Sequence, residues 1–347
     1  MIKDLILSIL AGLYSFAIAV RHKLFDWGII KSNEYDIPII CIGNITVGGT
    51  GKTPMTEMIV SYMSKYHTVA VLSRGYGRKT KGYMEVKENS HYRDVGDEPL
   101  QIKLKFPNIV VAVCEKRVNG IEQIRKKHPD VNLIIMDDGF QHRHVEPKIN
   151  VIMVDATRPP HEDQMLPLGR LRDRFDSLHR AHYFIVSKCP ENMTPLDRRI
   201  MRKVLVSMAY QEVYFTRLES FKPIPVFAEG KEREIKPNSN VIAIAGIGNP
   251  TPFIGSLQKS YNVVDATMFN DHHVYKMRDI NLMSSMLKKH PDSVIITTEK
   301  DAVKLIKSNK IAPEVRKNIF YIPINISFVD DSKVDFLKKL HQDVIKN

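Results

Sequence analysis

Short apolar runs alternate along this chain with segments in which apolar residues recur at helical spacing. Short runs rich in β-branched residues are typical of strands buried on both faces of a parallel sheet. Helical segments between such runs predict the crossover connections that parallel strands require. In the first part of the chain the predicted strands are 37–42, 69–72, 109–114, 131–136, 150–154 and 182–186, with helices over 55–63 and 118–127.

A change in composition near residues 220–240, where Pro, Glu and Lys are frequent, precedes four more such runs. These predict strands at 241–245, 263–268, 294–298 and 320–326. The chain has 347 residues, and single cores usually stop growing near about 250–300 residues, so we expect two lobes. The predicted division is an N-terminal helix (1–35), a first α/β domain (36–219), a linker (220–240) and a smaller α/β lobe (241–347) that closes a cleft.

The N-terminal segment carries no charged residue between Asp4 and Arg21. Its roughly sixteen residues make a helix of about 24 Å, shorter than a hydrocarbon core of about 30 Å. Lys23 and Trp27 follow, a combination that suits a helix lying in or dipping into a membrane surface. Two alternatives are a helix buried against the domain and a signal segment cleaved after residues 17–19, which read Ala-Ile-Ala.

Composition narrows the possible partners. The formal net charge of +12 and a pI near 9.4 favour an anionic partner: nucleic acid, an acidic membrane surface or a phosphorylated substrate. The three cysteines, Cys41, Cys114 and Cys189, are far apart and fit no metal-binding spacing. Few and odd in number, they indicate reduced thiols in a cytosolic setting.

A glycine-rich segment follows the first predicted strand and opens the first predicted helix. It reads Thr46, Val47, Gly48, Gly49, Thr50, Gly51, Lys52, Thr53. In a P-loop, backbone N–H groups and the helix N-terminus surround the phosphates, Lys52 would neutralise the β- and γ-phosphates, and Thr53 would bind Mg²⁺. The P-loop pattern places a Gly where Thr46 stands. The sequence therefore predicts a P-loop NTPase-like, mostly parallel sheet that binds ATP and Mg²⁺; a glycine turn that binds nothing is the alternative.

Asp137 and Asp138 stand directly after the predicted strand 131–136. Carboxylates at the C-terminal end of a parallel strand face the crevice where α/β folds bind ligands. There they could hold the Mg²⁺ that Thr53 also contacts. Two adjacent Asp residues can also cap a turn. Which of the two would bind the ion directly is left open by the sequence.

The class of phosphate chemistry depends on other motifs. Guanine recognition usually requires Asn-Lys-x-Asp, and residues 187–190 read Ser-Lys-Cys-Pro, so adenine is favoured. Membrane-associated partitioning-type ATPases, the main alternative, carry a second lysine where this chain has Val47. A nucleotide-dependent nucleic-acid binder lacks support, because no motif of interleaved aromatic and basic residues is present. No obligatory protein partner is evident either.

A kinase also needs a group that orients the acceptor hydroxyl, and two segments qualify. Residues 96–99 read Gly-Asp-Glu-Pro before a helical segment, where Asp97 could alternatively cap the helix. Residues 269–273 read Phe-Asn-Asp-His-His after a strand of the second lobe, where paired histidines are often structural. Brought together across a cleft, Asp97 and His272 would form a proton-accepting pair.

These motifs together resemble those of the tetraacyldisaccharide 4′-kinase family of lipid A biosynthesis in Gram-negative bacteria, over nearly the whole chain. The segments that carry the resemblance are 44–54, 72–76, 96–99, 137–142, 166–172 and 271–272. The resemblance implies transfer of the γ-phosphate of ATP to the 4′-hydroxyl of an acylated glucosamine disaccharide 1-phosphate. The product is lipid IVA, made at the cytoplasmic face of the inner membrane.

The resemblance also implies roles for single residues. Lys52 matches the phosphate-binding lysine, Thr53 the Mg²⁺ ligand, and Asp137 and Asp138 the paired acidic residues of the metal site. Asp97 and His272 match the pair that activates the sugar hydroxyl. By position in their loops, Arg74, Arg78 and Arg172 are candidates for contact with the substrate phosphate. Arg170 and Asp173 depart from the residues that the family often has at those positions.

Overall fold

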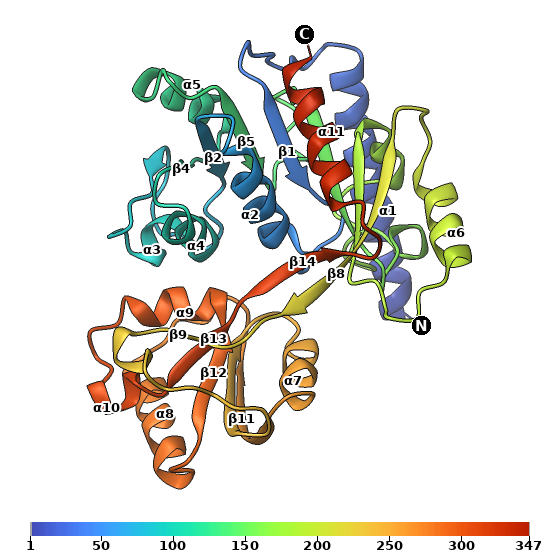
Figure 1. The fold of residues 1–347 in the computed structure, drawn as a ribbon. Coiled ribbons are helices and arrows are strands. Elements are labelled where there is room, and N and C mark those ends of the chain that lie inside the picture. The colour runs from blue at the N-terminus through green and yellow to red at the C-terminus, as the bar shows by residue number, and fades with distance from the viewer. Residues whose placement is uncertain (1, 347) are drawn as a thin grey trace.

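The computed structural model describes residues 2–346 and shows two α/β lobes joined by the extended strands β8 and β14 (Figure 1). The larger lobe contains a nine-stranded sheet in the order β14-β8-β7-β6-β1-β5-β2-β4-β3. Its strands are β1 Ile39–Gly43, β2 Val69–Ser73, β3 Met84–Glu85, β4 Val110–Val113, β5 Leu133–Asp137, β6 Ile149–Asp155, β7 Tyr183–Ser187, β8 Glu212–Ser220 and β14 Ile324–Phe328. All neighbours pair in parallel except the two edge strands β3 and β14.

The smaller lobe contains a five-stranded sheet in the order β11-β10-β12-β13-β9. Its strands are β9 Ile224–Pro225, β10 Asn240–Gly246, β11 Asn262–Phe269, β12 Val294–Thr298 and β13 Ile319–Ile322. The two mostly parallel sheets and the apolar N-terminal helix confirm the predicted fold class.

Helices cover both sheets. The α-helices are α1 Ile2–Asp26, α2 Lys52–Met63, α3 Tyr92–Val95, α4 Asp97–Lys105, α5 Arg117–Lys127, α6 Pro195–Leu205, α7 Thr251–Gln258, α8 Met277–Lys289, α9 Glu299–Ile306, α10 Pro313–Arg316 and α11 Lys333–Ile345. Short 3-10 helices span Pro160–Glu162, Phe175–Arg180 and Ala228–Gly230. Pro99 is the third residue of α4 rather than its first, a position that still needs no intrahelical N–H bond.

The central strands are buried over their whole length, as their apolar runs predict. Successive side chains of a strand point to opposite faces of the sheet. Ile40 of β1 therefore joins the core under α2 and α11, whereas Ile39 and Cys41 join the opposite core. Both cores are continuous across the sheet, so the strand ends are held at fixed positions relative to one another.

The run 320–326, predicted as one strand, is two strands in two different sheets. β13 pairs in parallel with β12, and β14 pairs antiparallel with β8 of the larger lobe. Pro323 lies between them; it has no N–H to donate, and its carbonyl accepts from the N–H of Phe221 at 3.2 Å. The chain thus returns to the larger lobe at this point, a change of sheet that an unbroken apolar run does not signal.

The predicted division at residues 220–240 and 241–347 needs two corrections. Residues 224–225 form the edge strand β9 of the smaller sheet, and Val226 and Phe227 are buried in its core, so this segment is not a free linker. β14 and α11 belong to the larger lobe, where Phe336 and Leu340 lie in the core under α2. The lobes are therefore connected by an antiparallel strand pair, from the Thr216–Phe328 pair to the Ser220–Ile324 pair, rather than by one linker.

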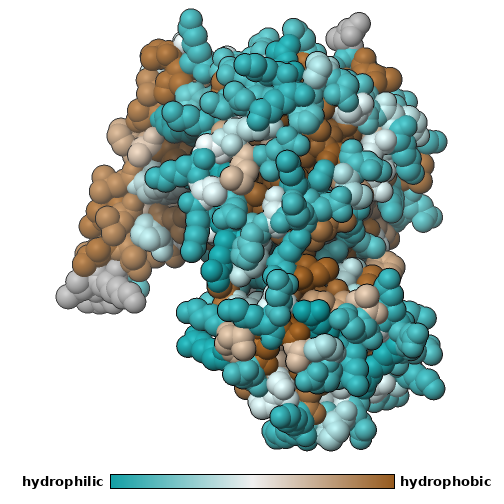
Figure 2. All heavy atoms as spheres, turned by 90° about the vertical axis from the view of Figure 1, so that its left-hand side faces the viewer, coloured by the Kyte–Doolittle hydropathy of each residue, from teal (hydrophilic) through white to brown (hydrophobic). Residues whose placement is uncertain are grey.

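Helix α1 extends beyond the predicted apolar run to Asp26, which gives it 25 residues and a length of about 37 Å. Ala11, His22 and Phe25 are buried against the larger lobe. The other face is exposed and apolar, a column visible in Figure 2; it consists of Leu5, Ile6, Ile9, Leu10, Leu13, Phe16 and Val20. Residues 4–26 are long and apolar enough to cross a membrane, and 6% of their apolar window is buried, so the alternative of a buried helix is wrong.

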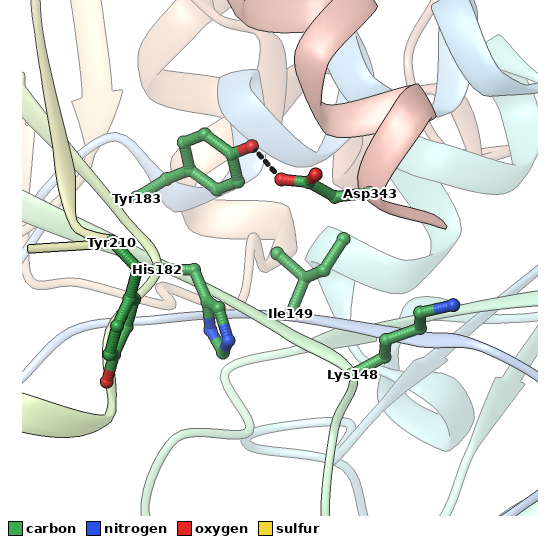
Figure 3. A pocket seen from close by; sticks show the side chains of 6 residues that line it. All are labelled: Lys148, Ile149, His182, Tyr183, Tyr210 and Asp343. Atoms are coloured by element: carbon green, nitrogen blue, oxygen red, sulfur yellow. Dashed lines mark hydrogen bonds between the residues drawn. The ribbon is translucent and has the colours of Figure 1, made fainter. Parts of the chain in front are cut away.

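A hollow lies at the N-terminal ends of the parallel strands, whereas the P-loop lies at their C-terminal ends. It is lined by Lys148, Ile149, His182, Tyr183, Tyr210 and Asp343 (Figure 3). Its polar groups have partners within the larger lobe: His182 Nδ1 accepts from the N–H of Asn150 at 3.1 Å, and Tyr210 donates to the carbonyl of His179 at 2.7 Å. Tyr183 donates to Asp343, and Lys148 donates to the carbonyl of Val344 at 2.9 Å. The contacts of Tyr183 and Lys148 therefore hold the end of α11 against the N-terminal ends of β6 and β7.

The packing of α11 predicts the effect of truncating Phe336. This ring is fully buried among those of Tyr183, Tyr214 and Phe328, with centroids 5.0 to 5.7 Å away. Phe336→Ala should destabilise the larger lobe by about 3–5 kcal/mol, measured by urea unfolding followed by circular dichroism. Val334→Ala, at an exposed position of the same helix, is the control and should change stability by less than about 0.5 kcal/mol. Equal midpoints for the two variants would contradict this placement of α11.

Candidate active site

The C-terminal ends of the parallel strands meet at one edge of the larger sheet, facing the smaller lobe (Figure 1). β1 leads into the P-loop, β5 ends at Asp137, and β2 leads to Arg74. The register pairs Ile42 with Asp137, so the first acidic residue lies beside the start of the P-loop segment. Residues distant in sequence are thus gathered at the edge where α/β folds bind ligands.

The P-loop has the backbone conformation that its glycines allow. Gly48 has φ 107° and Gly51, the N-cap of α2, has φ 86°, both in the region that side chains disfavour. Thr50 is held twice: its hydroxyl accepts from Asn44 Nδ2 at 2.9 Å, and its carbonyl accepts from Ser187 Oγ at 2.8 Å. Within residues 2–346 the N–H groups of residues 48–51 have no acceptor, which leaves them for an anion.

The first residues of the P-loop have a different role. Thr46 forms a β-bridge with Leu171, and the N–H of Val47 donates to the carbonyl of Arg170 at 2.9 Å. The segment that departs from the P-loop pattern is therefore paired with the loop before residue 173. The backbone of Thr46 and Val47 is therefore bonded to residues 170–171 in this structure.

Lys52 and Asp138 form the charged centre of the site. Lys52 Nζ lies 3.6 Å from Asp138 Oδ1 and 3.4 Å from Asn44 Oδ1. Arg172 contacts both oxygens of Asp138 and also Asn44. Burial alone would raise the pKa of Asp138, but Lys52 and Arg172 hold it well below its ordinary value. Arg172, a candidate for contact with the substrate phosphate, is thus paired with the carboxylate of Asp138 in this structure.

Asp137 is in a different environment. Its carboxylate is buried and accepts hydroxyl hydrogen bonds from Thr56 at 3.3 Å and from Ser73 at 3.4 Å. Burial, followed by the nearby charges of Glu98 and Asp138, raises the pKa of Asp137 to about 7. No Lys or Arg in the described part of the chain lies within ion-pair distance of it.

This donor set fits Mg²⁺ of the kind found at nucleotide sites. Such ions use one or two carboxylates together with hydroxyl, water and phosphate oxygens. Among residues 2–346 no three His, Cys, Asp or Glu side chains are arranged to hold a metal without such help. Asp137 is the last residue of β5 and Thr53 lies in the first turn of α2, so a carboxylate and a hydroxyl come from adjacent elements of the site.

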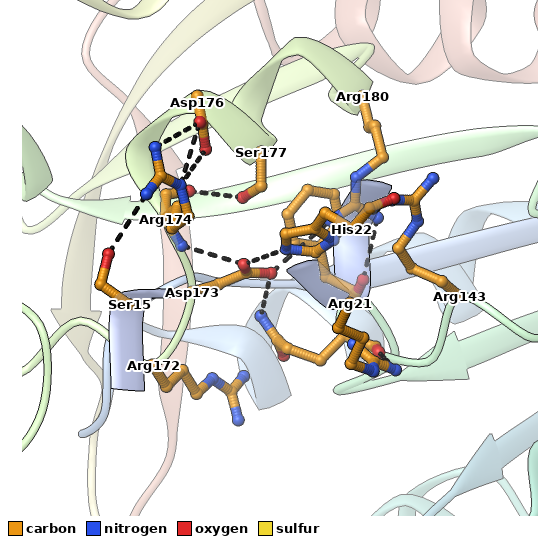
Figure 4. Close-up of polar contacts among 12 residues, drawn as sticks. Ser15, Arg21, His22, Arg143, Arg172, Asp173, Arg174, Asp176, Ser177 and Arg180 are labelled. Carbon is orange, nitrogen blue, oxygen red and sulfur yellow. Dashed lines mark hydrogen bonds and ion pairs between the residues drawn. The ribbon is translucent and has the colours of Figure 1, made fainter. Parts of the chain in front are cut away.

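The short segment 172–174 connects the P-loop region to α1 (Figure 4). The hydroxyl of Tyr14 donates to the carbonyl of Arg172 at 3.0 Å, and Arg174 donates to Ser15 Oγ at 3.2 Å. Between them the buried carboxylate of Asp173 accepts from His22 Nε2 at 2.6 Å. The N–H of Arg172 in turn donates to the carbonyl of Ile45, beside the P-loop. The exposed apolar helix and the nucleotide edge therefore share one continuous set of contacts.

Asp97 and His272, 175 residues apart, meet across the two lobes. His272 Nδ1 lies 3.0 Å from Asp97 Oδ2, while Asp97 Oδ1 accepts from the N–H of Glu98 at 3.0 Å. His272 adopts φ 56°, uncommon for this residue type, and the Tyr76 ring lies 4.9 Å from its ring. Burial opposes ionisation of Asp97, but the hydrogen bond from His272 and the charge of Lys300 lower its pKa to about 2.

Two lysines of α9 surround this pair, and the sequence analysis did not identify them. Lys300 Nζ lies 3.2 Å from Glu98 and 3.3 Å from Asp271. The buried Lys304 lies 3.6 Å from Asp97. The sequence pattern that could have identified these lysines is the charged segment 299–304, which directly follows the predicted strand 294–298. Asp137 likewise directly follows a predicted strand of the first lobe.

The other candidate residues have varied surroundings. Arg74 is exposed and, within residues 2–346, forms no hydrogen bond or ion pair, so its guanidinium is free to contact an anion. Arg78 is instead committed to Glu115 at 2.6 Å and to the carbonyl of Gly82. Arg117, which the sequence analysis missed, is buried near Asp137 and donates to the carbonyl of Cys114.

His273 and the second glycine turn have structural partners. His273 stacks on Phe269 at 4.0 Å and lies 3.0 Å from Asp279. The N–H of Gly246 donates to the buried Asp301 at 2.8 Å, so that group is not available to an anion. Of the two adjacent histidines, His272 is therefore the one that contacts the larger lobe, through Asp97.

Known proteins with similar sequences point to one family. Residues 3–342 match the family model described as Tetraacyldisaccharide-1-P 4'-kinase. The chain is 41% identical over 342 residues to the tetraacyldisaccharide 4'-kinase of Phocaeicola vulgatus, covering 96% of this chain and 93% of that protein. It is 39% identical over 334 residues to the enzyme of that name from Parabacteroides distasonis, covering 93% and 90% of the two chains.

The fold agrees with a solved structure. A crystal structure of LpxK from Aquifex aeolicus in complex with ATP superposes with a TM-score of 0.76 at 24% identity, over 99% of both chains. At that identity the match supports the fold alone. Together with the family model and the named relatives, it sets aside the alternative of a partitioning-type ATPase. The chain belongs to the tetraacyldisaccharide 4'-kinase family, a family of phosphotransferases.

Proposed function

We propose that this protein transfers the γ-phosphate of ATP to the 4′-hydroxyl of a tetraacylated glucosamine disaccharide 1-phosphate, which gives lipid IVA. The observation that carries the proposal is the meeting of Asp97 and His272 beside a P-loop at the junction of two lobes. Family membership supports the identity of both substrates. The direct test is labelled ATP with the tetraacylated disaccharide 1-phosphate in detergent micelles, scored for a bisphosphorylated glycolipid.

The nucleotide would bind at the start of α2. The N–H groups of residues 48–51 and the helix N-terminus provide donors for the phosphates, and Lys52 exchanges Asp138 for phosphate oxygens. Thr53 and Asp137 would hold Mg²⁺, with Asp138 beside them already neutralised by Arg172. When bound, the ion neutralises charge on the β- and γ-phosphates.

Asp97 would receive the acceptor hydroxyl. In the transfer, the bond from the γ-phosphorus to the bridging oxygen breaks and ADP leaves with the electron pair. The bond from O4′ to phosphorus forms, and the hydroxyl proton passes to Asp97. A carboxylate with a pKa of about 2 is a weak base, but phosphoryl transfer has a loose transition state and depends more on in-line placement than on early deprotonation. Asp97 therefore acts mainly by orienting the hydroxyl.

The lipid substrate would reach this site from the membrane. The exposed apolar face of α1 suits insertion among acyl chains at the cytoplasmic face of the inner membrane. The net charge of +12 favours an anionic leaflet and an anionic substrate. Arg74, directly after β2, would contact the sugar phosphate, whereas the ion pairs of Arg78 and Arg172 remove them from this proposal.

Lys52→Ala tests the P-loop. We expect a folded protein whose kcat with the tetraacylated substrate is at least about a hundredfold lower, because the phosphate charge loses its fixed cation. Lys65→Ala, at an exposed position just after the same helix, is the control and should leave kcat unchanged. Near-normal turnover by Lys52→Ala would refute the assignment.

Asp97→Asn tests the acceptor-orienting role. We expect kcat to fall by about 10²- to 10⁴-fold, with a much smaller change in ATP affinity measured by calorimetry. Asp94→Asn, exposed on the preceding helix, is the control. The charge of Asp97 also stabilises the fold: its pKa is lowered from 3.8 to about 2, so this contribution is complete above pH 4 and is lost as pH falls toward 2. If ATP binding collapsed while bound substrate still turned over, the proposed role would be wrong.

The exposed face of α1 predicts membrane binding that polar substitutions weaken. The triple variant Ile9→Ser, Leu13→Ser, Phe16→Ser should bind anionic phospholipid vesicles at least about tenfold more weakly in co-sedimentation, since three exposed apolar side chains are lost. The control is Leu196→Ser with Ile200→Ser, which removes exposed apolar side chains from α6. Equal loss of binding in both proteins would show that α1 has no special role at the membrane.

A further inference from the structure

Lys300 lies in the contact between the lobes, where it approaches both members of the Asp97–His272 pair and two neighbouring carboxylates. Its ammonium is 3.2 Å from Glu98 Oε1, 3.3 Å from Asp271 Oδ1 and 4.0 Å from Asp97 Oδ2. It is also 3.3 Å from His272 Nε2. Lys300 thus contacts the ring nitrogen of His272 that Asp97 does not.

These contacts select one tautomer of His272. A lysine ammonium has only N–H donors, so His272 Nε2 must accept. An ionised carboxylate only accepts, so Nδ1 must donate to Asp97. In this arrangement Nδ1 carries the hydrogen that faces Asp97 and Nε2 faces the Lys300 ammonium, with an Asp271 carboxylate oxygen 3.8 Å from Nε2. The carboxylate of Asp97 retains free lone pairs for the acceptor hydroxyl.

The start of α9 fixes Lys300 in this position. Thr298 caps the helix by accepting from the N–H of Asp301, and the buried Asp301 carboxylate accepts from Thr298 Oγ1 at 2.7 Å. Lys304, one turn after Lys300, lies on the same face of the helix and pairs with Asp301 at 3.0 Å. Lys300, which contacts His272, is thus carried by a helix whose first turns are fixed by contacts within the smaller lobe.

We propose that Lys300 is a positioning residue of the transfer reaction, which holds His272 in its Nδ1–H form against Asp97 and sets the smaller lobe in register on α4. The inference rests on the proposed role of Asp97. Without this lysine, the carboxylates of Glu98 and Asp271 have no shared cation, and His272 Nε2 has no donor. The ring is then free to turn, exchange tautomers or take up a second proton, and the Asp97 carboxylate loses its fixed orientation.

The test compares Lys300→Met with Lys307→Met. Lys307 is also on the α9 side of the contact and donates across the lobes to the carbonyl of Glu88 at 2.5 Å, but it touches neither Asp97 nor His272. We expect Lys300→Met to lower kcat about 10- to 100-fold with little change in KM for ATP. Lys307→Met should retain the wild-type kcat. Thermal unfolding of each full-length variant checks that it is folded.

A second measurement reads the tautomer directly. In protein with ¹⁵N-labelled histidine, long-range ¹H–¹⁵N correlations distinguish a protonated from an unprotonated ring nitrogen, and His272→Gln identifies the His272 signals by their absence. We expect an unprotonated Nε2 in the wild type and a mixture of forms, or a protonated Nε2, in Lys300→Met. If Lys300→Met does not fold, Lys300→Ala takes its place, since it also removes the donor to His272 Nε2.

A lower kcat together with altered His272 signals supports the inference. An unchanged kcat overturns it, and so does a lower kcat with unchanged His272 signals, because the lysine then acts by another route. Failure of the proposed function is distinguishable. If Asp97→Asn and His272→Gln kept wild-type kcat, the hydroxyl-orienting role itself would be wrong, whatever Lys300→Met did.

Discussion

The contact between the N-terminus of α4 and the N-terminus of α9 is the constraint on which the active site depends. One side brings the carboxylates of Asp97 and Glu98 from the larger lobe, and the other brings Lys300 and Lys304 from the smaller lobe. His272 completes the contact. Buried charges need partners of opposite sign, and here the larger lobe supplies the carboxylates and the smaller lobe the ammonium groups. The acceptor side of the site is therefore complete only when the lobes are docked.

On the nucleotide side of the site, too, charged side chains are paired with groups of opposite charge. Asp138 is balanced by Lys52 and Arg172, and the P-loop is held by Asn44. Among residues 2–346, no Lys or Arg lies within ion-pair distance of Asp137, an environment that fits the divalent ion proposed for it. Each group that would meet a phosphate or a metal therefore already sits in a fixed network, so little reorganisation is needed when substrate binds.

Helix α1 links this network to the apolar surface of the molecule. Its inward face contacts the segment 172–174, whose Arg172 side chain reaches Asp138 at the centre of the site. Its outward face is the apolar column proposed to enter the membrane. A lipid-embedded substrate and a soluble nucleotide can thus be brought to one place by a single rigid arrangement, with the antiparallel pair β8–β14 connecting the second lobe.

The sequence by itself determined most of the buried parallel strands, the P-loop segment and the acidic strand end, because burial on both faces and phosphate binding each demand local residue patterns. It did not predict β3, β8 or β9, which lie at or near the edges of the sheets. It also identified Asp97 and His272, since their motifs are local. The tertiary structure alone decided that residues 320–326 divide between two sheets at Pro323, and that α11 returns to the larger lobe. It decided, too, that Arg172 pairs with Asp138, that Arg78 pairs with Glu115, and that Lys300 faces His272. Such pairings depend on which elements pack against each other over long sequence separations, and no local pattern encodes that.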